Sequence, residues 1–163
     1  MKKSSIMMKW FLSIFLSLAL FACDKELGVG LHEDEKMAKQ LRNAPEDLRL
    51  EGINLDLSAD VWRDFMPPSE PDGSPMMAVV ELDGENGLLP DGIEPVRLYV
   101  VYGNDIWATG FDDVSMSDDE IQVSSRNGPK WGPDVEVDVV LMFNFDGKSY
   151  EIRDDDVTIE ATY

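Results

Sequence analysis

The chain contains one cysteine, Cys23, and one histidine, His32, and this scarcity limits the chemistry it can perform. A Ser–His–acid triad and a histidine-based zinc site both need a histidine on an ordered scaffold. His32 instead lies in a charged stretch with weak structural signals, where a solvated side chain is the ordinary outcome. A single cysteine allows no intramolecular disulfide and no paired-cysteine metal motif. We therefore expect a protein that is not an enzyme.

Cys23 stands at the end of a segment laid out like an export signal. Residues 1–9 carry three lysines and no acid, and residues 10–22 (WFLSIFLSLALFA) are apolar apart from two serines. This order of basic, apolar and small residues is typical of a secretory signal. The apolar run of 13 residues is shorter than the about 20 needed to span a bilayer. We expect residues 1–22 to be a cleaved signal peptide.

The four residues Leu20-Phe21-Ala22-Cys23 resemble the lipobox of bacterial lipoproteins, in which an aliphatic, a variable and a small residue precede the cysteine that becomes the new N-terminus. The resemblance covers only residues 1–23, and Phe21 is bulkier than the residue usual there. It implies a diacylglycerol on the sulfur of Cys23 and a fatty acyl group on its amine. Two or three chains, at about 0.8 kcal/mol per buried methylene, would anchor the protein permanently.

The expected location is therefore the bacterial cell envelope, at the inner or the outer membrane, with the membrane itself as a partner through Cys23. The alternative is a plain secretory signal followed by an incidental cysteine. Acids outnumber bases 33 to 14, and removing the three lysines of the signal changes the formal charge from −19 to −22. Such a field repels phosphate groups, which excludes nucleic acid as a partner.

Carboxylates gather in short clusters whose oxygens could bind calcium, which takes six to eight oxygen ligands. The candidate ligands are Asp112, Asp113, Asp118, Asp154, Asp155 and Asp156. Their spacing fits no calcium-loop pattern, so solvated acidic turns are the first interpretation and a Ca²⁺ site is the alternative. We expect no other cofactor.

Trp131 is the aromatic residue whose setting best suits ligand binding. It lies beside Lys130 in the loop GPKWGP (128–133), where glycine and proline bracket the ring. Prolines stiffen a loop, so Trp131 and Lys130 could form a pre-organised platform for a sugar or a peptide. The alternative is that Trp131 plugs the open end of the core. Trp62 and Trp107 lie in strand-like runs and are expected in the core.

Residues 23–47 and residues 48–163 differ in pattern. The first segment is charged and poor in aromatic residues, which indicates a lipidated N-terminus and an acidic tether with at most one short helix, ended by Asn43 and Pro45. From residue 48 the apolar period becomes two. Val135–Phe145 alternates most clearly, and Asp146-Gly147 then predicts a tight hairpin turn into residues 148–153.

A second hairpin is expected between residues 96–102 and 106–110. Further strands are predicted at 48–57, 61–65, 76–82, 120–124 and 156–162. Seven to nine short strands with turns between them indicate an all-β, antiparallel β-sandwich of immunoglobulin or fibronectin type. A small closed barrel is the alternative.

These features favour a non-enzymatic, membrane-anchored binding module of the cell envelope with a protein or glycan partner. Two other functions remain open. The first is a structural or assembly subunit whose acidic surface contacts a basic patch. The second is a calcium-binding β-sandwich.

Overall fold

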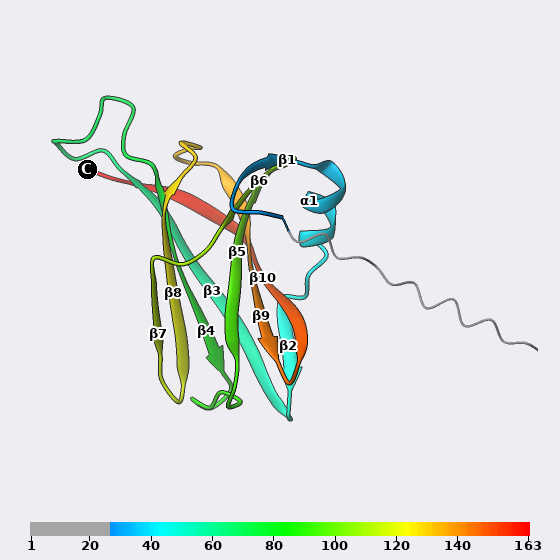
Figure 1. Ribbon diagram of the computed structural model, residues 1–163. Coiled ribbons are helices and arrows are strands. Elements are labelled where there is room, and N and C mark those ends of the chain that lie inside the picture. The colour runs from blue at the N-terminus through cyan, green and yellow to red at the C-terminus, as the bar shows by residue number, and fades with distance from the viewer. Residues whose placement is uncertain (1–26) are drawn as a thin grey trace, which may run out of the picture.

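A computed structural model describes residues 27–163, so the predicted signal peptide and Cys23 lie outside the described residues (Figure 1). The described part contains one helix and ten strands. In chain order they are β1 (Gly30–Glu33), α1 (Glu35–Leu41), β2 (Asp47–Leu50), β3 (Ile53–Asp64), β4 (Met76–Gly84), β5 (Glu94–Tyr102), β6 (Asp105–Thr109), β7 (Asp113–Met116), β8 (Glu120–Gly128), β9 (Glu136–Phe145) and β10 (Lys148–Thr162).

The all-β prediction is confirmed, and the strands form one curled, mixed sheet in the order β1-β6-β5-β9-β10-β3-β4-β8-β7, with β2 also paired to β3. All pairs are antiparallel except β10 with β3. β10 pairs with β9 as far as Thr158, across a register shift between Asp154 and Val157, and then runs parallel to β3 from Ile159 to Thr162. Such a bulge bends a strand and increases its local twist. The two strands predicted over 148–162 are therefore one.

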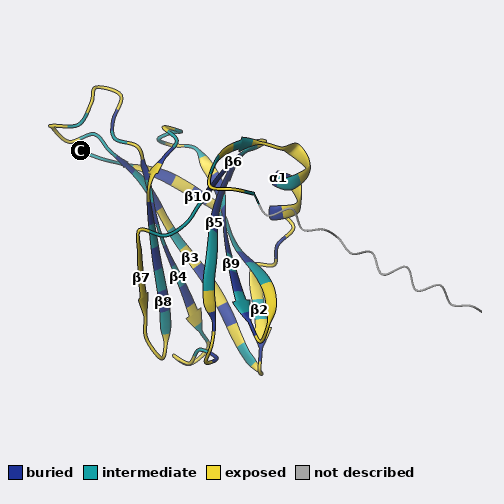
Figure 2. Ribbon diagram, viewed as in Figure 1, coloured by how far each residue is buried: buried dark blue, intermediate teal, exposed yellow. Residues whose placement is uncertain are grey.

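The main hydrophobic core lies between the two halves of the curled sheet. The period of two predicted for β9 is confirmed, since Val137, Val139, Leu141 and Phe143 are all buried there. Alternate residues of β3, β4 and β8 from the other half complete the same cluster. Figure 2 shows this alternation of buried and less buried residues along the strands, and an exposed β7 at the edge.

The tether prediction is wrong for residues 30–47, because this stretch belongs to the folded part. β1 pairs with β6, and α1 buries Ala38 and Leu41 completely against the outer face of β5, β6 and β9. The physical reason is that this outer face is also apolar, with Tyr99 and Val140 fully buried under the helix. An apolar sheet face must be covered, and a short helix with few apolar residues is sufficient to cover it.

Local interactions fix the covering segment in place. The Asp34 side chain caps α1 by accepting from the amide of Met37 at 2.9 Å. Asp138 on β9 then accepts from Arg42 and from Arg153, each at 2.8 Å. Arg153 also bonds Glu46 at 2.5 Å. These half-buried ion pairs join the chain after the helix to β9 and β10.

Candidate functional site

Trp131, the predicted platform residue, is half-buried and packs against the main core. Its ring lies 5.6 Å, centroid to centroid, from the ring of Tyr102 at the end of β5. Neighbouring Lys130 donates from Nζ to Glu70 at 2.7 Å and to Asp72 at 2.8 Å. The side-chain bond from Lys130 is the main influence that lowers the pKa of Asp72, and the same bond raises the pKa of Lys130. Both predicted ligand residues thus already contact other parts of the chain.

Arg63, which the sequence did not single out, organises this end of the molecule. It is 4% exposed and donates to the carbonyls of Ser74, Lys130, Gly132 and Asp72. These carbonyls belong to the loop between β3 and β4 and to the loop that carries Trp131. Arg63 is two residues after Val61 on β3, so its side chain faces the core as that of Val61 does; this alternation is the one sequence signal of its burial. The buried guanidinium of Arg63 therefore fixes the Trp131 loop by hydrogen bonds to its carbonyls.

The predicted calcium ligands are not brought together. Asp112 accepts from the amide of Arg126 at 2.7 Å, Asp113 begins β7, and Asp118 lies in the β7–β8 turn. Asp154, Asp155 and Asp156 lie at the bulge of β10 instead. Across residues 27–163, no group of three or more histidine, cysteine, aspartate or glutamate side chains is arranged to hold a metal ion.

Asp154 has a structural contact of its own. Its Oδ2 accepts from the amide of Ala59 at 2.8 Å, between the last β2 partner on β3, Asp56, and the first β10 partner, Val61. A side chain thus satisfies a strand amide on the side of β3 where neither β2 nor β10 pairs with it. Burial raises the pKa of Asp154, Asp60 and nearby acids add to the rise, and the Ala59 bond opposes it.

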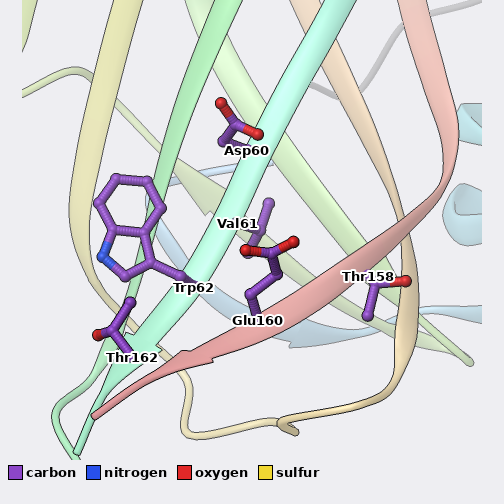
Figure 3. A pocket seen from close by; sticks show the side chains of 6 residues that line it. All are labelled: Asp60, Val61, Trp62, Thr158, Glu160 and Thr162. Carbon is purple, nitrogen blue, oxygen red and sulfur yellow. The ribbon is translucent and has the colours of Figure 1, made fainter.

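The prediction for Trp107 is confirmed, since it is 5% exposed, but the prediction for Trp62 is wrong. Val61 and Arg63 face the core, so Trp62 faces outward on β3. There it lines a groove of about 320 Å³, where β10 joins β3 (Figure 3). The groove is lined by Asp60, Val61, Trp62, Thr158, Glu160 and Thr162.

Figure 3 shows the groove side chains rising from two adjacent strands, Asp60 and Trp62 from β3 and Glu160 and Thr162 from β10. Glu160 is the direct cross-strand partner of Trp62. The lining thus combines one indole, two carboxylates and two hydroxyls, with no lysine or arginine. Sequence reasoning missed this set because its members are about 100 residues apart and meet only through the parallel pairing of β3 with β10.

Carboxylates continue from the groove across the outer face of β3, β4 and β8. Asp56, Asp83 and Glu120 are cross-strand neighbours in one row, and Glu81 lies in the adjacent row. Burial and then the charge of Glu81 raise the pKa of Asp83 and of Glu120, and Asp56 adds to the rise at Asp83. We call this surface, with Asp60 and Glu160, the acidic face. Its carboxylates repel one another, so a cation placed among them would be stabilised.

A second, larger groove of about 700 Å³ lies beside α1 on the other half of the sheet. Its apolar lining includes Leu27, Met37, Leu48, Met142 and Tyr150, and polar side chains of α1 form its rim.

No protein-family model, no curated protein and no solved structure matches the chain. In the part of the chain that the structure describes, no helix is both long and apolar enough to cross a bilayer.

Proposed function

We propose that this chain is a lipid-anchored, non-enzymatic binding module of the bacterial cell envelope. Lipid on Cys23 holds it at a membrane, and the folded part binds a protein or glycan partner. The residues 20–23 support the anchor, through their resemblance to the lipobox. The observation that carries the binding role is the groove at Trp62, because a large aromatic ring on an uncovered sheet face is a common feature of binding surfaces.

We infer further that the fold is an immunoglobulin-like sandwich. In that fold strands A, B, E and D form one sheet, strands G, F and C form the other, and some members add C′. Here β3, β4, β8 and β7 correspond to A, B, E and D, while β10, β9, β5 and β6 correspond to G, F, C and C′. The strand order and the core between the two halves support this inference. β1, α1 and β2 are additions to that plan.

The second candidate is a structural or assembly subunit of an envelope complex. The acidic face favours it, because a row of like charges suits contact with a basic surface. Neutralising the acids away from the groove separates the two. Association led by the acidic face as a whole should weaken strongly when Asp56, Asp83 and Glu120 are replaced by their amides. Contact centred on the groove should instead depend mainly on Trp62.

The anchor is tested with the Cys23→Ala variant, since this is the chain's single cysteine. We expect the wild-type protein to fractionate with membranes and to incorporate labelled fatty acid. The variant is expected to do neither. A variant that still does both overturns the anchor.

The binding role is tested by cross-linking in intact cells with Trp62→Leu and, as a matched control, Trp131→Leu. We expect the cross-linked partner to be lost with the first variant and kept with the second. Loss with Trp131→Leu alone would instead place the partner at the loop of residues 128–133.

A further inference from the structure

We propose that the Trp62 groove binds an arginine side chain presented by a basic partner polypeptide. The inference rests on the proposed binding role and names the chemistry of its partner. The guanidinium would lie on the face of the Trp62 indole, and Asp60 and Glu160 would accept its N–H donors.

The indole supplies the first part of the argument. The negative face of a tryptophan ring attracts a cation more strongly than any other side-chain ring, and arginine is its most frequent partner. Trp62 lies on the outer face of β3, and its cross-strand neighbours are Glu160 on β10 and Met77 on β4. The ring is half-buried and thereby positioned before any ligand arrives.

The carboxylates supply the second part. Asp60 and Glu160 are both exposed; Asp60 precedes Trp62 by two residues on β3, and Glu160 lies directly across from Trp62 on β10. A planar guanidinium can stack on a ring and, at the same time, donate to carboxylates at its edge. A lysine ammonium matches this arrangement less well, because it is a compact point charge.

The rest of the acidic face favours a basic polypeptide over a neutral glycan as the ligand. Beyond the groove lie Asp56, Glu81, Asp83 and Glu120 on β3, β4 and β8. A neutral sugar leaves the repulsion among these acids unchanged, whereas a basic segment relieves it along its length. Arg49 lies on β2, and Arg126 lies on β8 beside the row of Met77 and Trp62; neither lines the groove.

The size of the groove indicates how much of the partner enters it. A volume of about 320 Å³ is at the lower end of the range for small-molecule sites, about 300–1,000 Å³. One side chain would fill it, and neighbouring basic residues of the partner would lie over the strands. We therefore expect affinity to depend on one central arginine and on the surrounding charge.

The test is calorimetric titration of the mature lipidated protein, in neutral detergent, with hexa-arginine, hexalysine and the neutral sugar chitotetraose. We expect hexa-arginine to bind most tightly and chitotetraose to give no heat. Trp62→Leu and the double variant Asp60→Asn/Glu160→Gln should each weaken hexa-arginine binding at least tenfold. The matched double variant Glu94→Gln/Asp146→Asn removes the same charge from exposed positions outside the groove lining. It should change affinity less than twofold.

Three results would overturn the proposal. Equal losses in the two double variants mean that the whole charge of the protein attracts the peptide and the groove does not. Chitotetraose binding that depends on Trp62 makes the groove a glycan site. Absence of hexa-arginine binding in low salt removes the cation site altogether.

These failures can be told apart from failure of the proposed function. If the cellular cross-link persists in Trp62→Leu, the protein is still a binding module and only the groove assignment is wrong. If Cys23→Ala stays at the membrane while hexa-arginine binding is normal, the anchor is wrong and the groove assignment stands.

Discussion

The outer faces of the two halves of the curled sheet differ in whether another element covers them. On β5, β6 and β9 the outward positions include Tyr99, Val101 and Val140, all fully buried because α1 lies on them. On β3, β4 and β8 the outward positions include Trp62 and, among neutral residues, the carboxylates of the acidic face, and no element of the described chain covers them. A side chain that points outward from the sheet is therefore not always exposed, because another element can cover it. The residue types on a face determine whether the chain must cover it.

The largest expected loss of stability comes from a substitution in the covered half. Leu41→Ala should lower the free energy of unfolding by about 3 kcal/mol, because Leu41, the last residue of α1, is fully buried against the sheet. Met77→Ala on the acidic face should lower it by no more than about 1 kcal/mol, since that side chain is only half-buried. Urea denaturation of both variants measures the difference. Equal losses would mean that the two faces do not differ as described.

A smaller effect concerns the junction of the halves, where Asp154 bonds the amide of Ala59. Asp154→Ala removes the acceptor and should cost about 1–2 kcal/mol of stability. Asp154→Asn keeps an acceptor oxygen and removes a charge that nearby acids disfavour, so its stability should equal or exceed that of the wild type. Urea denaturation of the two Asp154 variants measures these changes. A larger loss for the Asn variant than for the Ala variant would contradict the role assigned to this bond.

A third prediction concerns how the unfolding free energy depends on pH, because of the acidic face. The pKa values of Asp83 and Glu120 are raised in the fold, so the folded state binds protons more tightly than the unfolded state. Unfolding free energy should therefore rise as pH falls from neutral toward about pH 4, and this gain is complete below the ordinary pKa values. At lower pH the depressed pKa of Asp72 acts in the opposite direction, because its ion pair with Lys130 is lost.

Thermal unfolding between pH 7 and about pH 4 measures this rise. Asp83→Asn should make the rise smaller. Asp146→Asn, on the β9–β10 turn, changes the net charge equally and is the control. A rise that is unchanged in Asp83→Asn would show that the raised pKa of Asp83 is not its source.

The smallest effect concerns the Trp131 loop. Trp131→Leu should lower stability by about 1 kcal/mol, because the ring packs partly on the core and against Tyr102. Hexa-arginine affinity should stay within twofold of wild type. Loss of that affinity in Trp131→Leu, with Trp62→Leu unaffected, would move the site to the loop.

Much of the fold could be predicted because its strongest signals are local. The alternation of β9 and the Asp-Gly turn before β10 are readable within a dozen residues, and both are confirmed. The short helix allowed for before Asn43 matches α1, but β1 and the docking of this charged segment on the sheet were not predicted, because few of its residues are buried. β7 was missed for a similar reason, since its four residues are all exposed and show no alternation. The strand predicted over 48–57 is interrupted at Glu51 and Gly52, which both have positive φ and form the turn from β2 to β3.

The candidate site was less predictable because it depends on pairing between distant strands. Trp62 was assigned to the core from its strand-like surroundings. Val61 and Arg63 face the core, so Trp62 between them faces outward, but arginine is a residue type that does not by itself indicate an inward position. Glu160 reaches Trp62 only because the end of β10, from Ile159 onward, pairs with β3 once its pairing with β9 has ended at Thr158. No local pattern in the sequence encodes that change of partner.

The central claim is that the uncovered acidic face contacts the partner. The most direct test introduces a photo-crosslinking residue at Met77, on that face beside Trp62, or at Lys39, on the exposed side of α1 over the covered half. Each variant is expressed as the full-length protein and irradiated in intact cells. We predict a discrete cross-linked partner from position 77 and none from position 39. A partner captured from position 39, or equally from both, would contradict the account.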